Sequence, residues 1–340
     1  MSANIPFISI ILQSYNYAKY LPRSLDAIKR QTYKDIEVIL VNNGSTDNSQ
    51  EVIEAFVQEN PDIRATSVLV PNNQGIAPGR NAGLAKATGK YVLFHDADDW
   101  MADGCLAALA ELASKTDADK VFGSFREVTS KGKTLRVYTF CENQSKWFTV
   151  SLQATLYKRS IVEEHQIEFK EHTWLDDLEF NTFFNVHVRK IAFTNELIYN
   201  YAVSQYSTSG AQIKKKTWSQ LDLQQDMLTL FVPLLARLEG KDKADLYYII
   251  IKQYYFFMLH ANRYATIREV NEYYRTARDM MRTHLPDYLR QKGIASFQKN
   301  GDRRSGRLIT GVFYTAERLR CIKVLLWLFL GLSKITYAHP

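Results

Sequence analysis

Two clusters of carboxylates are the residues of this sequence best suited to chemistry. The first is Asp96-x-Asp98-Asp99, which is separated from the apolar run Tyr91 to Phe94 only by His95. A strand that ends there would place its carboxylates at one edge of a sheet, and carboxylate oxygens are preferred ligands of Mg²⁺ and Mn²⁺. A divalent ion held by only one or two of them keeps coordination sites open for substrate phosphates. The alternative is a solvated acidic turn.

The second cluster is the pair Asp176 and Asp177, in an acidic segment that begins near Trp174. Adjacent carboxylates shift each other's pKa, which can tune one of them into a base that works near neutral pH. The alternative is that both acids favour the N-terminus of a helix through the helix dipole.

The elements that must position these acids follow a regular pattern in the first hundred residues. Short β-branched apolar runs alternate with segments of helical periodicity, which predicts a mainly parallel, twisted sheet covered by helices on both faces. Strands are expected at 7–13, 36–41, 66–70 and 90–95. Such sheets bind ligands beyond the carboxyl ends of their strands. Three polar segments follow predicted strands: 13–16, 42–47 and 95–100.

The character of the chain changes near residue 212. Residues 119–210 mix strand-like runs with the acidic helix and complete an α/β domain over 1–211, whereas 212–340 is predicted to be a helical annex. Within the annex, 307–335 reads as a C-terminal helix.

Composition narrows the functional classes. The chain has 340 residues, a net charge of +7 and three cysteines. That charge suits acidic small molecules, anionic lipid surfaces or nucleic acid about equally, but the basic residues are dispersed and match no nucleic-acid-binding module, so no nucleic-acid partner is expected. The odd number of cysteines and the lack of a secretory signal at the N-terminus favour a cytoplasmic location.

Five motifs occur in an order that is typical of one family. They are Ile8 to Asn16, Leu25 to Tyr33, Val38 to Asp47, Asn73-x-Gly75 with Gly79-Arg80-Asn81-x-Gly83, and Phe94 to Trp100. In these motifs the chain resembles family 2 glycosyltransferases of the GT-A fold through most of 7–105, and more weakly at 156–209. The resemblance implies an inverting enzyme that transfers a sugar from a nucleotide diphosphate donor.

The resemblance also implies roles for particular residues. Asp177 would be the base that deprotonates the acceptor hydroxyl. Asp98 would hold Mn²⁺ or Mg²⁺, and Asp96 would face the ribose or the metal. The implied donor-binding residues are Ser14, Tyr15, Asn16, Asn42, Asn43, Arg80, Asp96, Ala97 and Asp98. Secondary candidates are Asp99, Asp176, Trp174 and His172.

One departure from the family concerns the donor base. Asn42 and Asn43 stand where the family has two aspartates. An Asn carbonyl can accept the N3–H of uracil, while its NH₂ group can donate to N3 of cytosine. A UDP-sugar is the expected donor, with the base left open between these two. The pair followed by Gly44 also reads as a simple turn that needs positive φ.

The C-terminal stretch bears on location and partners. The apolar run that starts at Ile322 ends before Ser333 and Lys334, which makes it shorter than the roughly 20 residues of a spanning helix. Its basic flanks and Trp327 resemble an interfacial helix on an anionic leaflet. The alternative is a helix docked on the domain or on another subunit of a homo-oligomer.

The resemblance implies a setting for this chemistry. It is the assembly of a bacterial surface polysaccharide on a lipid-linked glycan acceptor, by an enzyme peripheral to the inner face of the cell membrane. A soluble or wall-polymer acceptor is one alternative. The other is a nucleotide-sugar-binding protein without catalysis. The presence of both acidic clusters argues against this second alternative.

Overall fold

The computed structural model describes residues 5–73, 75–148, 152–170, 175–203, 220–261, 266–294 and 302–336. The chain divides into two compact units. Unit 1 comprises Met1–Glu142 and Thr149–Ala211, and unit 2 comprises Asn143–Phe148 and Gln212–Pro340. The short segment 143–148 therefore belongs to the second unit, although the chain on both sides of it belongs to the first.

Unit 1 is an α/β domain, as the sequence predicts. Its strands are β1 (Ile8–Ser14), β2 (Ile36–Asn43), β3 (Arg64–Val70), β4 (Tyr91–Asp96), β5 (Trp100–Met101), β6 (Lys120–Val128), β7 (Thr134–Tyr138), β8 (Thr155–Lys158) and β9 (Ile191–Ala202). Its helices are α1 (Leu21–Lys29), α2 (Ser49–Glu59), α3 (Ile76–Leu84), α4 (Cys105–Thr116), α5 (Arg159–Glu164) and α6 (Asp176–His187).

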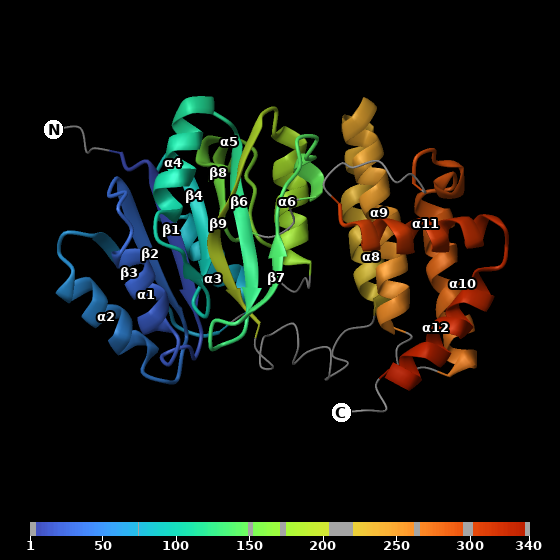
Figure 1. Cartoon of the computed structure of the whole chain (residues 1–340), viewed down its shortest axis with the longest axis horizontal. Helices are drawn as coiled ribbons and strands as arrows, with labels where there is room; N and C mark the ends of the chain where they lie inside the picture. Colours follow the sequence, from blue (N-terminus) through green and yellow to red (C-terminus); the bar gives the residue numbers. More distant parts are fainter. Residues whose placement is uncertain are drawn as a thin grey trace. The chain divides into compact units, whose positions relative to one another are not determined.

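These strands form one sheet in the order β3-β2-β1-β4-β8-β6-β9-β5, with β7 paired to β6 (Figure 1). Strands β1, β2, β3 and β4 run parallel to one another, as the alternation of strand and helix predicts. Strand β8 lies antiparallel to both β4 and β6, so the sheet is mixed. The carboxyl ends of β1, β2 and β4 consequently lie side by side at one edge.

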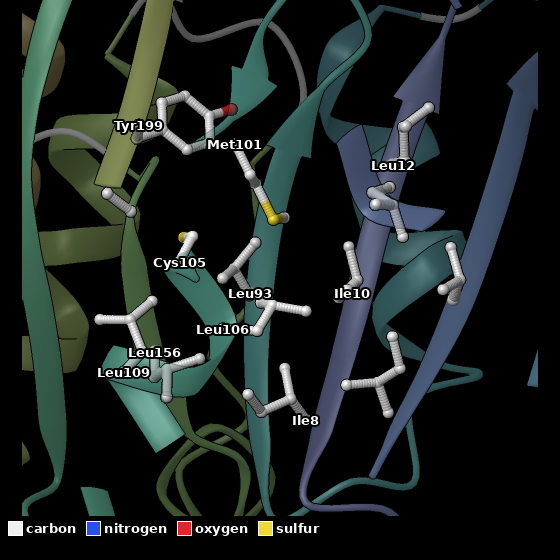
Figure 2. Close-up of a cluster of buried hydrophobic side chains, with 14 of the residues drawn as sticks. Ile8, Ile10, Leu12, Leu93, Met101, Cys105, Leu106, Leu109, Leu156 and Tyr199 are labelled. Atoms are coloured by element: carbon white, nitrogen blue, oxygen red, sulfur yellow. The ribbon is translucent and has the colours of Figure 1, made fainter. Parts of the chain in front are cut away.

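Helices cover both faces of the sheet, because side chains along each strand point alternately to opposite faces. On one face, Ile8, Ile10 and Leu12 of β1 pack with Leu93 and with Leu106 of α4 (Figure 2). Helices α1 and α2 bury their apolar residues in the same cluster. On the other face, Ile11 of β1 joins a second cluster with residues of α3, α5 and α6. An apolar cluster on each face therefore holds the sheet between two layers of helices and fixes the position of its polar edge.

Unit 2 is helical, as predicted. Its elements are η1 (Lys146–Phe148), α8 (Gln220–Phe231), η2 (Val232–Arg237), α9 (Gly240–Ala261), α10 (Ile267–His284), η3 (Tyr288–Arg290), α11 (Arg304–Arg318) and α12 (Ile322–Thr336). The segment 143–148 is fixed to α9, because Ser145 Oγ donates to Asp245 at 2.6 Å and the indole of Trp147 donates to Asp242 at 2.9 Å.

The predicted single helix at 307–335 is wrong. The structure has two helices, α11 and α12, separated at 319–321. Arg320 adopts φ of 62°, which interrupts the right-handed helix. The N–H of Cys321 then donates to the carbonyl of Ala316 at 2.8 Å and closes the end of α11. None of the helices in the described residues is both long and apolar enough to cross a lipid bilayer.

Glu317 is a buried carboxylate at the centre of unit 2. Four tyrosine hydroxyls donate hydrogen bonds to it, from Tyr254, Tyr255, Tyr274 and Tyr288. Two of these tyrosines lie on α9, one on α10 and one on η3, so a single residue of α11 joins three other elements. A buried carboxylate with this many donors is well satisfied, and losing a donor is costly.

Candidate active site

The site is built where β1, β2 and β4 end. Ser14 of β1 is in register with Asn42 of β2, and Gln13 is in register with Asp96 of β4. The three polar segments predicted to follow strands are thus brought together at one edge of the sheet, as expected for parallel strands.

The loop after β1 is tied to the turn after β2. The side-chain carbonyl of Asn16 accepts from the N–H of Thr46 at 2.7 Å, and the N–H of Asn16 donates to Ser45 Oγ at 3.0 Å. Asn16 adopts φ of 56°, which asparagine tolerates better than most residues. Ser14 is buried, whereas the ring of Tyr15 is exposed and free to contact a ligand.

The turn after β2 has the conformation that its sequence predicts. Gly44 adopts φ of 73°, and a Cβ atom there would lie 2.5 Å from the backbone nitrogen of Asn73. Glycine is therefore required both by the left-handed conformation and by the close approach of the 72–73 backbone.

The two asparagines before Gly44 have different hydrogen bonds. Asn42 accepts from the N–H of Ser45 at 2.9 Å and donates to Gln50 at 2.7 Å. The NH₂ group of Asn43 donates to the carbonyl of Gly75 at 2.6 Å, which fixes the orientation of this amide because a carbonyl can only accept. Among the described residues, the buried Oδ1 of Asn43 has no hydrogen-bond partner. Asn43 therefore has an unused acceptor, while its NH₂ group donates to Gly75 and, at 3.4 Å, to Asn73 Oδ1.

The acidic turn after β4 places its three carboxylates in different surroundings. Both oxygens of Asp96 accept hydrogen bonds, one from Arg80 at 3.3 Å and one from the amide of Gln153. The half-buried Asp98 forms no ion pair with any described cation, and burial and the charge of Asp96 raise its pKa to about 6. Asp99 is buried and accepts from the N–H of Ala202 at 2.7 Å, which ties the turn to β9.

Ala97 lies between these acids and has a different role. Its side chain is buried in the apolar cluster beneath the turn. Only the backbone of Ala97 can then contact a ligand, which is consistent with a small residue at this position.

Arg80 joins the two acidic clusters. From α3, the buried guanidinium donates to Asp96, to Asp176 at 2.9 Å and to Asp177 at 2.7 Å. It also lies 5.1 Å from the ring centroid of Phe169. Burial alone would lower the pKa of Arg80, but the three carboxylates outweigh burial and raise it. Residues 80, 96 and 177, far apart in the sequence, therefore share one charged junction.

Asp177 has the electrostatic surroundings of a base. Burial raises its pKa, Arg80 opposes that shift, and the charges of Asp176 and Asp96 add to it, so that the pKa rises to about 7. Both acids lie in the first turn of α6, where the helix dipole favours negative charge. The helix interpretation of this pair is confirmed, because both acids begin α6; the role of Asp177 as a base stays a prediction, with which its raised pKa is compatible.

Asp98 is the residue that best fits a divalent cation. The described residues contain no group of three or more metal-ligating side chains. A metal at this edge would therefore depend on few protein ligands and on substrate oxygens, which is the arrangement expected for Mg²⁺ and Mn²⁺ at phosphate sites. Both oxygens of Asp96 already accept hydrogen bonds, so a metal at this edge would find more unused lone pairs on Asp98 than on Asp96.

Two residues of the site were not predicted from the sequence. Arg23 of α1 donates to the carbonyl of Asp98 at 2.7 Å, and its guanidinium lies 3.8 Å from the ring centroid of Trp100. Gln153, just before β8, donates to Asp96. Neither belongs to a motif, so only the fold reveals them. Of the predicted residues, His172 and Trp174 lie outside the described residues.

The sequence model of glycosyl transferase family 2 matches residues 9–167. An uncharacterized glycosyltransferase of Nostoc sp. is 38% identical over 128 residues, which are 38% of this chain and 39% of that protein. The chondroitin synthase of Pasteurella multocida is 28% identical over 209 residues, which are 60% of this chain and 21% of that protein. These matches span less than half of the length of each relative.

Solved structures extend the likeness over almost the whole chain. Residues 1–349 of S. aureus TarS in complex with UDP-GlcNAc superpose with a TM-score of 0.72 and 17% identity, covering 92% of each chain. A mannosyltransferase of Pyrobaculum calidifontis in complex with GDP-Man and Mn²⁺ gives a TM-score of 0.57 and 18% identity, covering 99% of this chain and 89% of the other. This likeness confirms the prediction of a GT-A fold followed by a helical region.

Proposed function

We propose, because residues 9–167 match the sequence model of glycosyl transferase family 2, that the chain is an inverting glycosyltransferase. It moves a sugar from a nucleotide diphosphate donor to a hydroxyl group of a glycan acceptor. The observation that carries this proposal is the junction at Arg80, which holds the donor-side acid Asp96 and the proposed base Asp177 on one guanidinium.

Asp177 is the catalytic base in this proposal. A sugar hydroxyl is a weak acid, so its proton must leave as the oxygen attacks the anomeric carbon from the face opposite the leaving diphosphate. A carboxylate whose pKa is about 7 accepts a proton more readily than an ordinary aspartate, and about half of such groups are ionised and ready to accept one at neutral pH. Asp177 takes this proton, and Arg80 orients its carboxylate.

The donor diphosphate would lie near the acidic turn, with Arg80 as its cationic contact. Asp98 would hold Mn²⁺ or Mg²⁺, with Asp96 toward the ribose. The bound ion would supply positive charge against the charge that develops on the leaving diphosphate. The Mn²⁺ in the related mannosyltransferase structure supports this use of a metal.

The hydrogen bonds of Asn43 support uracil as the donor base. The side-chain atom of Asn43 that has no hydrogen bond among the described residues is Oδ1, which can only accept. An acceptor matches the N3–H donor of uracil and not the N3 acceptor of cytosine. The UDP-GlcNAc in the TarS structure agrees with this choice. The donor is accordingly a UDP-sugar, bound by the segments around Ser14 to Asn16 and Asn42 to Asn43.

The acceptor is a glycan under construction, carried on a lipid at the inner face of the cell membrane, in the assembly of a surface polysaccharide. The similarity to a chondroitin synthase supports a growing glycan chain as the acceptor. A soluble or wall-polymer glycan is the alternative acceptor, and homo-oligomers formed through the helices of unit 2 are compatible with either.

The test measures UDP release and sugar transfer from a panel of UDP-sugars and glycan acceptors, with Mn²⁺ and after chelation. Asp177→Asn should abolish transfer and preserve the rise in melting temperature that UDP causes, since a ligand that binds the folded state stabilises it. UDP should raise the melting temperature more than CDP. A wild-type protein that binds UDP but transfers nothing, with Asp177→Asn indistinguishable from it, would show a binding protein without catalysis.

A further inference from the structure

Helix α11 exposes a stripe of large apolar side chains. Leu308, Ile309 and Val312 are 50%, 45% and 43% exposed, and their spacing places them on one face of the helix. The opposite face carries Phe313, Tyr314 and Glu317 into unit 2. Large apolar side chains gathered on a surface mark an interaction site more often than chance.

Helix α12 also has large apolar side chains on its exposed face. Val324, Trp327 and Leu328 are exposed at helical spacing, whereas Ile322 and Leu326 are buried. The turn between the two helices is exposed as well, and its Leu319 is 71% exposed. Each of these two consecutive helices therefore leaves an apolar stripe uncovered in the described residues.

The charges around the two stripes are all of one sign. The exposed ionisable residues among 303–329 are Arg303, Arg304, Arg318, Arg320 and Lys323. The only carboxylate in that segment is Glu317, which is buried and bound by the four tyrosine hydroxyls of unit 2. The surface formed by α11, α12 and their turn therefore presents five cations and no anion to its surroundings.

We propose that this surface, the exposed faces of α11 and α12 with the turn 319–321, docks on an anionic lipid membrane. Apolar side chains enter the boundary between headgroups and acyl chains, and the cations contact the headgroups. Trp327 is the kind of residue that prefers this boundary. A second copy of the chain fits less well, because a twofold contact sets each patch against itself and would bring like charges together.

The cations give the first experiment, which measures binding of the full chain to phosphatidylcholine vesicles with and without phosphatidylglycerol. Wild type should bind only the anionic vesicles, and more weakly as salt is raised. The triple variant Arg318→Gln, Arg320→Gln, Lys323→Gln should bind about 100-fold more weakly, from about 1 kcal/mol per cation. The matched control is Arg275→Gln, Arg282→Gln, Lys292→Gln, three other exposed cations of unit 2, which should bind like wild type.

The apolar stripe gives the second experiment. Leu308→Ser with Val312→Ser alters only exposed side chains and should weaken vesicle binding about tenfold. Equal binding of wild type to neutral and anionic vesicles, or equal loss in the control triple variant, would overturn the proposal. So would a wild-type dimer in sedimentation equilibrium that this double variant dissociates.

The docking surface is separate from the transfer activity, and the two can fail independently. Asp177→Asn should bind vesicles like wild type, and the triple variant on α11 and α12 should transfer sugar to a soluble acceptor at the wild-type rate. Loss of vesicle binding in Asp177→Asn would contradict the assignment of binding to these helices.

Discussion

A nitrogen of Arg80 lies 2.7 Å from a carboxylate oxygen of Asp177. The proposed base is therefore paired with a cation that also contacts Asp96, on the side of the site where the donor would bind. Any change in the charge of this junction must alter the pKa of Asp177. Substitutions of neighbouring residues should therefore shift the pKa of Asp177 in opposite directions.

Replacing Arg80 by methionine removes the charge that holds down the pKa of Asp177. The pKa should rise above about 7, so the acidic limb of the pH profile of kcat should move to higher pH. Breaking a buried ion pair should also cost about 3–5 kcal/mol of unfolding free energy. Kinetics at saturating donor and thermal melts measure both effects. Arg80→Lys, which keeps the charge, should return the limb toward its wild-type position.

Replacing Asp176 by asparagine should have the opposite effect on the same limb. Asp176 raises the pKa of Asp177 through its negative charge, so the neutral amide should lower that pKa below about 7. Activity should then persist to lower pH than in wild type. A limb that moves to higher pH in both variants would contradict the assignment of Asp177 as the titrating base.

Replacing Asp98 by asparagine should weaken the use of the divalent ion. Half-maximal rate should need at least about 10-fold more Mn²⁺, the loss that even outer partners of a metal ligand cause. The measurement is the rate of UDP release against Mn²⁺ concentration. Asp103→Asn alters an exposed acid five residues along the chain and should leave the Mn²⁺ dependence unchanged.

The first four strands were predictable from the sequence, whereas the short strands β5 and β8 and several contacts of the site were not. Local periodicity placed β1 at 7–13, and the structure has it at Ile8–Ser14. The hydrogen bond from Arg23 to Asp98 joins residues 75 positions apart, and no local pattern encodes it. The break at Arg320 was missed for a different reason: no glycine or proline stands there, and helical periodicity continues across it.

Glu317 gives a prediction about stability. Burial raises its pKa, and the tyrosine hydroxyls lower it only in part. The folded state therefore holds the proton more tightly than the unfolded state. The unfolding free energy should then fall as pH rises from the usual pKa of glutamate toward the folded value. Glu317→Gln should flatten this dependence in denaturant titrations at acidic and neutral pH.

The tyrosine that donates most closely to Glu317 can be tested against a matched control. Tyr288→Phe removes a hydrogen bond of 2.6 Å and should cost about 1–3 kcal/mol, more at neutral than at acidic pH. Tyr314→Phe removes a buried hydroxyl that donates to the backbone carbonyl of Gln291 at 2.8 Å. Its cost should not depend on pH, and an equal dependence in both variants would exclude Glu317 as the source.

The short segment 143–148 imposes an order on biosynthesis. A ribosome completes most of the sheet before it makes α9, yet the buried Trp147 belongs to unit 2 and donates its indole hydrogen bond to Asp242, which is synthesised about a hundred positions later. During synthesis, Trp147 must therefore stay exposed, between segments that already belong to the sheet, until Asp242 and Asp245 of α9 have been made. For the same reason a protease cut or a gene split near residue 211 cannot release two complete units, because the N-terminal part would retain 143–148, which belongs to unit 2.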